Sequence, residues 1–314
     1  MKVGIKGVVS RVICIAVSLL IFSGVCLHLS QYLPYRDFRL QMVWDDIYSG
    51  EDIDYLFVGS SHVYTAVDPF VVEDMTGGKT LLISSGVQTM AETCYSIEEA
   101  LKYQSPKIVF VDLYGLYRDF SDRDYNFMNV DCMRFSHTKI KLAYSAYSEA
   151  SPIDVCFPLI REHSNWKETD NIEHNKMMLE YPAENTKGFF GIDSVMPDEN
   201  VEYFEKLSYD GAEFTLREKD VKYLHKIEEI CKDRGVDVRF VMLPWYKGFA
   251  DKINYQSLMD AIGNEIEFTD YTYACGEEMG LDHTFFIEEK PSDNQHLNIK
   301  GAKIFTKYLV ETQI

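Results

Sequence analysis

Short apolar runs alternate with amphipathic stretches along most of the chain. Continuous apolar runs bounded by polar or turn residues predict five strands, at 53–59, 79–86, 107–115, 236–244 and 266–271. Helical spacing of apolar positions predicts helices at 91–104, 214–235 and 297–313, after a charged connecting helix at 36–53. Strands that alternate with helices predict an α/β fold with a central parallel sheet, in which chemistry gathers at the carboxyl ends of the strands.

The N-terminal stretch predicts a membrane-spanning helix. From Val12 to Leu29 the apolar run is interrupted only by Ser18, Ser23 and His28. A helix of this length rises about 27 Å, close to the thickness of a bilayer core. The basic residues of the leader precede the run, so we expect a cytoplasmic N-terminus and a body outside the membrane. The run favours an uncleaved signal anchor, with a cleaved signal peptide and a helix of a cytosolic protein as the alternatives.

Two segments follow from these patterns. Residues 1–34 are expected to form a cytoplasmic tail and anchor, and residues 35–314 one extracytoplasmic domain. Within that domain residues 118–213 break the strand–helix alternation and are rich in Asp, Asn, Ser and Tyr. We interpret them as an irregular insertion that covers or walls the site.

Charge and cysteine content exclude several classes of protein. The formal net charge is −19, and a nucleic-acid partner would need a basic surface instead. The five cysteines outside the anchor are irregularly spaced, which argues against a disulfide framework or a zinc site and favours buried thiols. The Gly-Ser-Ser turn at 59–61 lacks the Gly-Lys pair of a nucleotide-binding loop, and we expect no cofactor.

The first predicted strand ends in Gly59-Ser60-Ser61-His62, a candidate nucleophile turn. A serine hydroxyl needs a base within hydrogen-bond reach, a group that orients this base, and donors for the oxyanion. Asp293 and His296 lie three positions apart just before the last helix, so one loop offers both a base and its orienting acid. An ordinary turn and an ordinary helix cap are the alternatives for the two motifs. Their order at the two ends of an α/β pattern favours a Ser61–His296–Asp293 triad.

This arrangement resembles the SGNH (GDSL-type) hydrolase superfamily over residues 50–118 and 214–314. The resemblance implies a flavodoxin-like three-layer α/β/α fold, with Ser61 as nucleophile, His296 as base and Asp293 as its orienting acid. It also implies that the amides of Ser61 and Gly86 form the oxyanion hole. Two positions depart from the family pattern, because Ser60 replaces the usual Asp and the stretch VDLYGLYRD at 111–119 lacks the usual Asn. The third oxyanion donor is therefore left open between Tyr114, Asn126 and Asn129.

These departures are similar to those of the membrane-anchored branch of the superfamily, which includes teichoic-acid D-alanyl-transfer proteins and alginate O-acetyltransferases. The resemblance implies acyl transfer or ester hydrolysis on a cell-envelope or exported polysaccharide, beside a membrane-bound O-acyltransferase partner. The other interpretations are a non-catalytic pseudoenzyme that acts as a scaffold for such a partner, and a carbohydrate-binding domain. A serine-reactive probe separates the first of these from an enzyme.

Four further side chains are candidates for substrate contacts. His62 adjoins the nucleophile and is expected to form part of a wall. Arg161, His163 and Trp166 lie close together in the insertion, where Arg and Trp suit anionic or sugar ligands, although a surface helix start explains them equally well. A metal site built from His62, His296 and Asp293 is disfavoured, because three ligands would have to converge around an open position.

Overall fold

The computed structural model describes residues 5–30, 32–117, 127–147, 150–164, 167, 169–180, 184–290 and 296–314. Its centre is one sheet of five parallel strands, namely β1 (Tyr55–Gly59), β2 (Thr80–Ser84), β3 (Ile108–Asp112), β4 (Asp237–Met242) and β5 (Phe268–Asp270). The strand order is β2-β1-β3-β4-β5. The predicted α/β fold with a parallel sheet is confirmed, and every strand lies inside its predicted run.

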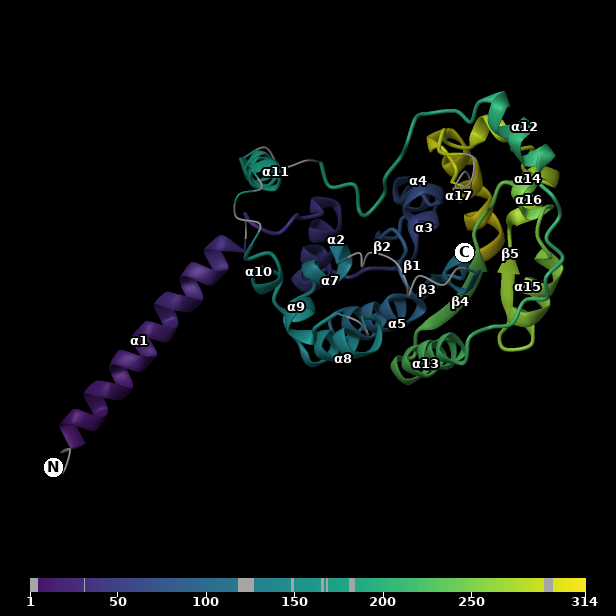
Figure 1. Cartoon of the computed structure of the whole chain (residues 1–314). Helices are drawn as coiled ribbons and strands as arrows, with labels where there is room; N and C mark the ends of the chain where they lie inside the picture. The colour runs from purple at the N-terminus through teal and green to yellow at the C-terminus, as the bar shows by residue number, and fades with distance from the viewer. Residues whose placement is uncertain are drawn as a thin grey trace.

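Helices form most of the remaining described chain (Figure 1). They are α1 (Ile5–Leu29), α2 (Phe38–Ser49), α3 (Ser61–Ala66), α4 (Pro69–Thr76), α5 (Met90–Ala100), α6 (Tyr114–Tyr117), α7 (Met128–Cys132), α8 (His137–Ser145), α9 (Pro152–Cys156), α10 (Pro158–Arg161), α11 (Thr169–Glu180), α12 (Asp198–Lys206), α13 (Glu218–Arg234), α14 (Lys247–Ala250), α15 (Tyr255–Gly263), α16 (Thr272–Glu277), the short 3₁₀ helix η1 (His283–Phe285) and α17 (Ile299–Gln313).

Side chains of the strands alternate between two hydrophobic clusters. On β1, Leu56 and Val58 belong to one cluster and Phe57 to the other, where it stacks on Phe110 of β3 at 4.5 Å. The first cluster contains residues of α2, α5 and α13, and the second contains residues of α3, α4 and α17. This double burial explains why β1, β2 and β3 are nearly continuous apolar runs without a polar face.

Helix ends follow the capping signals in the sequence. Gly235 follows α13 with a φ of 67°, the left-handed conformation that glycine adopts without strain. Asn298 precedes α17, and its side chain accepts hydrogen bonds from the amides of Lys300 and Gly301. This cap fixes the start of α17 immediately after His296, so the loop before the helix is anchored at its C-terminal end.

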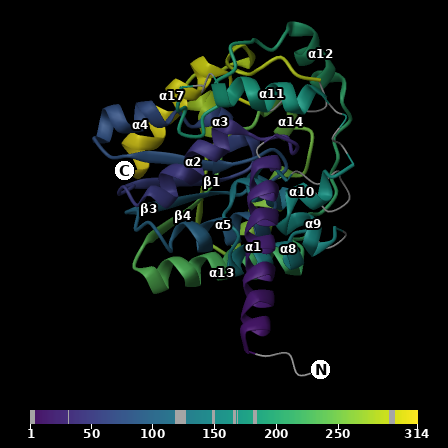
Figure 2. The same ribbon diagram turned by 90° about the vertical axis from the view of Figure 1, so that its left-hand side faces the viewer.

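The N-terminal helix α1 projects away from the sheet domain, as Figures 1 and 2 show. Its segment Gly7–Cys26 is long and apolar enough to cross a membrane, and no part of that segment is buried against the domain. A chain in water would hide so long an apolar surface, so the exposure is typical of a helix surrounded by lipid. The short connection to α2 therefore holds the domain next to the end of this helix.

The insertion predicted as irregular is largely helical in its described part, which corrects the expectation from the sequence. Helices α7 to α12 fall within it, and α8 packs against α5. Several are only four or five residues long, too short to show helical periodicity. Their starts are marked instead by local signals, such as Ser136 before α8 and the Ser151-Pro152 pair at α9.

Burial raises the pKa of Glu92, near the start of α5, to about 7. The amide of Glu92 donates to the Thr89 hydroxyl, and its carboxylate accepts from the Thr89 amide, a reciprocal capping box. Side chains of Tyr147 and Asn129 also hydrogen-bond to the carboxylate and oppose the shift. The protonated form is therefore favoured by folding, and the charged form is disfavoured.

We expect Glu92→Gln to flatten the pH dependence of stability. A carboxyl whose pKa is raised by folding stabilises fully below its unfolded pKa, near 4, and this contribution is lost as pH rises through about 7. Between pH 5 and pH 8 the variant should therefore lose about 2–3 kcal/mol less unfolding free energy than the wild type. Urea unfolding of the detergent-solubilised protein measures this difference. Equal pH slopes in the two proteins would contradict it, and the exposed Glu229→Gln is the control.

Candidate active site

The turn after β1 carries the predicted nucleophile. Gly59 ends the strand, Ser60 caps α3, and Ser61 is the first residue of that helix. A Cβ atom at position 59 would lie 2.5 Å from the Cβ of Asp112, so only glycine fits there. Because β1 pairs with β2 in register from Tyr55 to Gly59, the turns after both strands meet at one edge of the sheet.

Asp112 at the end of β3 holds this turn in place through hydrogen bonds. Its carboxylate accepts hydrogen bonds from the Ser60 hydroxyl at 2.7 Å and the Ser60 amide at 3.3 Å. Burial raises the pKa of Asp112 to about 6, and hydrogen bonds from Ser60 and the Tyr114 amide oppose that shift. Ser60 thus connects the turn that carries Ser61 to the neighbouring strand.

His296 lies against the nucleophile. Its Nε2 atom is 2.7 Å from the Ser61 Oγ, and its Nδ1 atom lies 2.8 and 3.0 Å from the two carboxylate oxygens of Glu289. A carboxylate accepts only, so Nδ1–H donates to Glu289 and Nε2 is left to accept the Ser61 hydroxyl. The structure therefore brings Ser61 and His296 together in the geometry of a serine nucleophile and its base.

Glu289 is a residue that the sequence analysis missed. The predicted acid, Asp293, lies outside the described residues, and the carboxylate placed at Nδ1 is that of Glu289. Backbone pairing brings it there: the Ile287 amide donates to the His296 carbonyl at 3.0 Å, and Phe286 forms an antiparallel bridge with Leu297. This pairing brings the segment that carries Glu289 next to His296, and no local motif signals it.

His62 lies behind the reacting groups. Only 1% of its surface is exposed, and its ring centroid lies 4.6 Å from that of His296 and 3.9 Å from that of Tyr114. Trp245 packs farther along the same wall, at 6.5 Å. His62 therefore supports the ring of the base, as a wall residue would, and its burial argues against the predicted contact with substrate.

Tyr64 is a second residue that the sequence analysis missed. It follows Ser61 by three positions on α3, which places both side chains on one face of the helix. Burial raises the pKa of the Tyr64 phenol, and Glu289 adds to this shift, whereas Arg39 and a hydrogen bond with Ser61 oppose it. The phenol thus borders the nucleophile, although a tyrosine on a short helix carries no signal of this role in the sequence.

The proposed oxyanion donors lie at the paired strand ends. Gly86 is in the turn after β2, whose conformation is fixed by Gln88 bonding to the amide and hydroxyl of Ser85. Of the candidates for the third donor, Asn129 is buried elsewhere, between the indole of Trp44 and the hydroxyl of Ser96. Tyr114 is buried against His62, and Asn126 lies outside the described residues.

The predicted substrate residues of the insertion have structural roles in the described chain. Arg161 binds Asp131 at 2.5 Å and Glu162 at 2.8 Å, and its guanidinium lies over the ring of Phe127. The exposed His163 bonds through Nδ1 to the Ile160 carbonyl. Arg161 therefore holds insertion helices together, and no contact described here joins it to Ser61. Trp166 lies outside the described residues.

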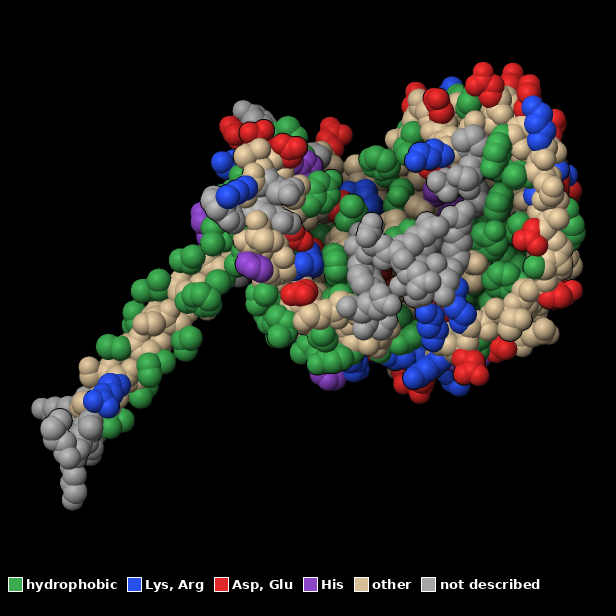
Figure 3. All heavy atoms as spheres, in the orientation of Figure 1, with side chains coloured by type: hydrophobic (Ala, Val, Ile, Leu, Met, Phe, Trp, Pro, Cys, Tyr) green, Lys and Arg blue, Asp and Glu red, His purple; other side chains and the backbone are tan. Residues whose placement is uncertain are grey.

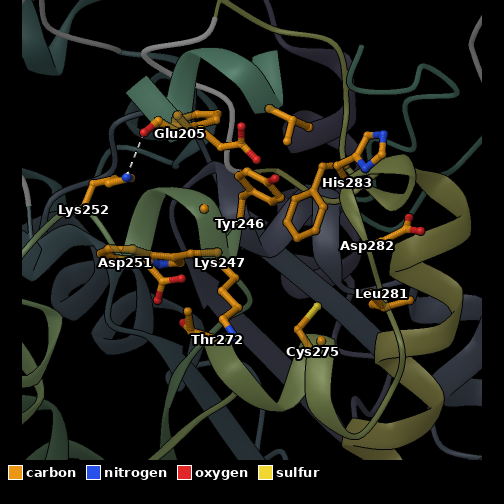
Figure 4. Close-up of a pocket in the computed structure, with 16 residues that line it drawn as sticks. Glu205, Tyr246, Lys247, Asp251, Lys252, Thr272, Cys275, Leu281, Asp282 and His283 are labelled. Carbon is orange, nitrogen blue, oxygen red and sulfur yellow. Dashed lines mark hydrogen bonds between the residues drawn. The ribbon is translucent and has the colours of Figure 1, made fainter. Parts of the chain in front are cut away.

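A cavity of about 450 Å³, which Trp245 helps to line, opens at the same end of the sheet. Figure 4 shows this cavity with its lining side chains. Its lining mixes aromatic and charged side chains, including Tyr246, Phe286 and His283. The Lys252 ammonium within it donates to the Glu205 carbonyl at 3.1 Å. Neither Ser61 nor His296 lines it, so the reacting groups lie outside this cavity.

Metal binding has no support among the described residues, which contain no group of three His, Cys, Asp or Glu side chains able to hold an ion. The five cysteines of the domain are free and buried, in agreement with the prediction from their spacing.

The sequence matches no protein-family model and no curated protein. The geometry of Ser61, His296 and Glu289 is therefore the basis of the functional argument.

Proposed function

We propose that this chain is a membrane-anchored serine acyl-transfer enzyme of the SGNH type, an O-acyltransferase or an esterase. The observation that carries the proposal is the 2.7 Å contact between the Ser61 hydroxyl and His296 Nε2, with Glu289 at Nδ1. The strand order 2-1-3-4-5 is that of flavodoxin-like sheets and supports a three-layer α/β/α domain. Basic residues before the apolar part of α1, such as Arg11, favour an extracytoplasmic domain.

Acylation begins when the Ser61 oxygen attacks the carbonyl carbon of an acyl donor. His296 takes the hydroxyl proton at Nε2, and Glu289 stabilises the resulting imidazolium through Nδ1–H. Backbone amides of Ser61 and Gly86 hold the negative oxygen of the tetrahedral intermediate. When the intermediate collapses, the bond to the leaving group breaks, His296 returns the proton to that group, and an acyl-serine remains.

Deacylation repeats these steps with an incoming hydroxyl. His296 removes the proton of that hydroxyl as it attacks the acyl-serine, and then protonates Ser61. With water the net reaction is ester hydrolysis, and with a sugar hydroxyl it is O-acylation. We propose that the acceptor is a cell-envelope or exported polysaccharide, with a membrane-bound O-acyltransferase as partner. An anchor that keeps the domain beside the bilayer supports this assignment.

Ser61→Ala should abolish covalent labelling by a fluorophosphonate probe and lower p-nitrophenyl acetate hydrolysis by at least three orders of magnitude, because the variant has no nucleophile. Labelling of the full-length protein in detergent, followed by peptide mapping, measures this loss. Ser60→Ala is the matched control: it removes the adjacent hydroxyl and its bond to Asp112, and should retain labelling at a reduced rate.

One observation favours the scaffold interpretation as a second candidate. The segment at 111–119 lacks the Asn of the family pattern, and Asn129 is bonded to Trp44 and Ser96 in the core. A non-catalytic scaffold should give no probe label at Ser61 in the folded wild-type protein. That result would reject the enzymatic proposal and leave the scaffold role.

A further inference from the structure

A second cavity, of about 370 Å³, lies directly beside the nucleophile turn. It is bounded by the chain that follows α1, by α3, by the turn after β2, and by α11 with the chain after it. The surface is visibly hollowed between α11 and the part of the domain that carries α12 and α17 (Figure 3). The lining is rich in aromatic and methionine side chains: Tyr35, Phe38, Met42, Tyr64, Met178 and Phe190.

The charged group of Arg39 in the lining is already bonded to protein. The Arg39 guanidinium donates to the carbonyls of Ser84 and Gly188 at 2.9 and 2.7 Å and pairs with Asp37 at 3.1 Å. It also lies over the ring of Tyr64, 4.8 Å from the centroid. Its charge therefore fixes the wall of the cavity, and the side chains around it give the space an apolar character.

The cavity and the reacting groups share two residues. Tyr64 lines the cavity and hydrogen-bonds to Ser61, and Gly86 lines it from the turn that supplies the proposed oxyanion amide. A carbonyl held between Ser61 and Gly86 has its oxygen at the amides, so its carbon chain is left to extend past Tyr64. The neighbouring apolar space reaches this turn through Tyr64 and Gly86.

Helix α11, which forms one side of the cavity, is bonded to the segment that follows α1. Buried Asn175 of α11 donates from Nδ2 to the carbonyls of Tyr32 and Pro34, at 2.8 and 2.7 Å. The adjacent His174 stacks on Tyr35, with ring centroids 4.9 Å apart. Tyr35 follows the end of α1 by six positions, so the apolar cavity forms close to where the anchor leaves the bilayer.

We propose that this cavity binds the hydrocarbon part of the acyl group, and that the preferred acyl group is a saturated chain longer than acetyl, taken from the membrane side. This inference rests on the proposed acyl transfer through Ser61. Each methylene moved from water into an apolar site favours binding roughly fourfold. Hexanoyl, with four more methylenes than acetyl, should therefore react with a kcat/KM at least ten times that of acetyl.

The experiment compares p-nitrophenyl acetate with p-nitrophenyl hexanoate on the full-length protein in detergent. Met178→Trp on α11 and Met42→Trp on α2 fill the cavity from two different helices, and each should lower the hexanoyl-to-acetyl ratio at least tenfold while acetyl turnover stays within twofold. Met177→Trp is the matched control, because Met177 directly precedes Met178 on α11 and is 53% exposed. Its ratio should equal that of the wild type.

The inference would be overturned if the wild type preferred the acetyl ester, or if both cavity variants kept the wild-type hexanoyl-to-acetyl ratio. An equal loss of turnover on both esters in both variants would also overturn it. A binding measurement separates this inference from the enzymatic proposal. Saturation-transfer NMR detects hexanoate bound to the Ser61→Ala protein, and the Met177→Trp protein serves as the reference. Turnover that depends on Ser61 without a chain-length effect rejects only the cavity assignment. Hexanoate binding that Met178→Trp removes, without turnover in the wild type, rejects only the enzymatic proposal.

Discussion

His296→Ala should lower the kcat for acetyl-ester hydrolysis by about three orders of magnitude or more, with the fold intact. The Ser61 hydroxyl loses the Nε2 atom that lies 2.7 Å away, and no base remains to accept its proton. Steady-state kinetics with p-nitrophenyl acetate measures the loss, and circular dichroism checks the fold. The effect should fall on kcat rather than on KM, because the imidazole acts in the proton transfers.

The matched control for this variant is His163→Ala. His163 is an exposed histidine of the insertion, bonded through Nδ1 to the backbone of α10, and its removal should change turnover by less than twofold. Near wild-type turnover in His296→Ala would contradict the assignment of the base. A retained rate in that variant would also remove the main support for the acyl-serine mechanism.

Glu289→Gln should lower kcat by about 10³-fold to 10⁴-fold, comparable to the loss expected when the acid of a catalytic triad becomes an amide. The amide of Gln can donate to Nδ1 and thereby favour the imidazole tautomer whose Nε2 carries the proton. That tautomer cannot accept from Ser61. Glu289→Asp keeps the charge on a shorter side chain and should recover part of the rate, which a purely structural role would not predict.

Asp293→Ala decides between the two candidates for the acid that orients the base. The described carboxylate at His296 Nδ1 is that of Glu289, so removal of the Asp293 carboxyl is expected to change kcat by only a few fold. Glu288→Gln controls for charge, since Glu288 is the adjacent acid and donates its amide to the Ser194 hydroxyl. Large losses in Asp293→Ala together with normal rates in Glu289→Gln would restore the triad predicted from the sequence.

Local pattern was sufficient to predict the strands and the capped helices. β1, β2 and β3 are buried along their whole length, so they are nearly continuous apolar runs, and this pattern can be read from a single sequence. The insertion could not be predicted in the same way. Its helices are short and held by long-range contacts, such as the Arg161–Asp131 pair and the Asn175 bonds to the chain after α1.

The candidate site was predictable where chemistry coincides with a motif. Ser61 follows the first strand and His296 precedes the capped last helix, and the structure places them in contact. Glu289 reaches the base only through the backbone pairing of residues 286–287 with 296–297, which is a tertiary event without a sequence signature. Tyr64 and Arg39 likewise acquire their positions from packing between segments that are distant in sequence.

The short segment between α1 and α2 limits how far the domain can lie from the end of α1. Residues 30–37 could extend by no more than about 28 Å, and the bonds from Asn175 hold part of this segment folded against α11. The domain therefore cannot swing freely at the end of a long tether. Under the proposed function, the site would stay near the end of the candidate membrane-spanning helix, and an acceptor would be modified close to the bilayer.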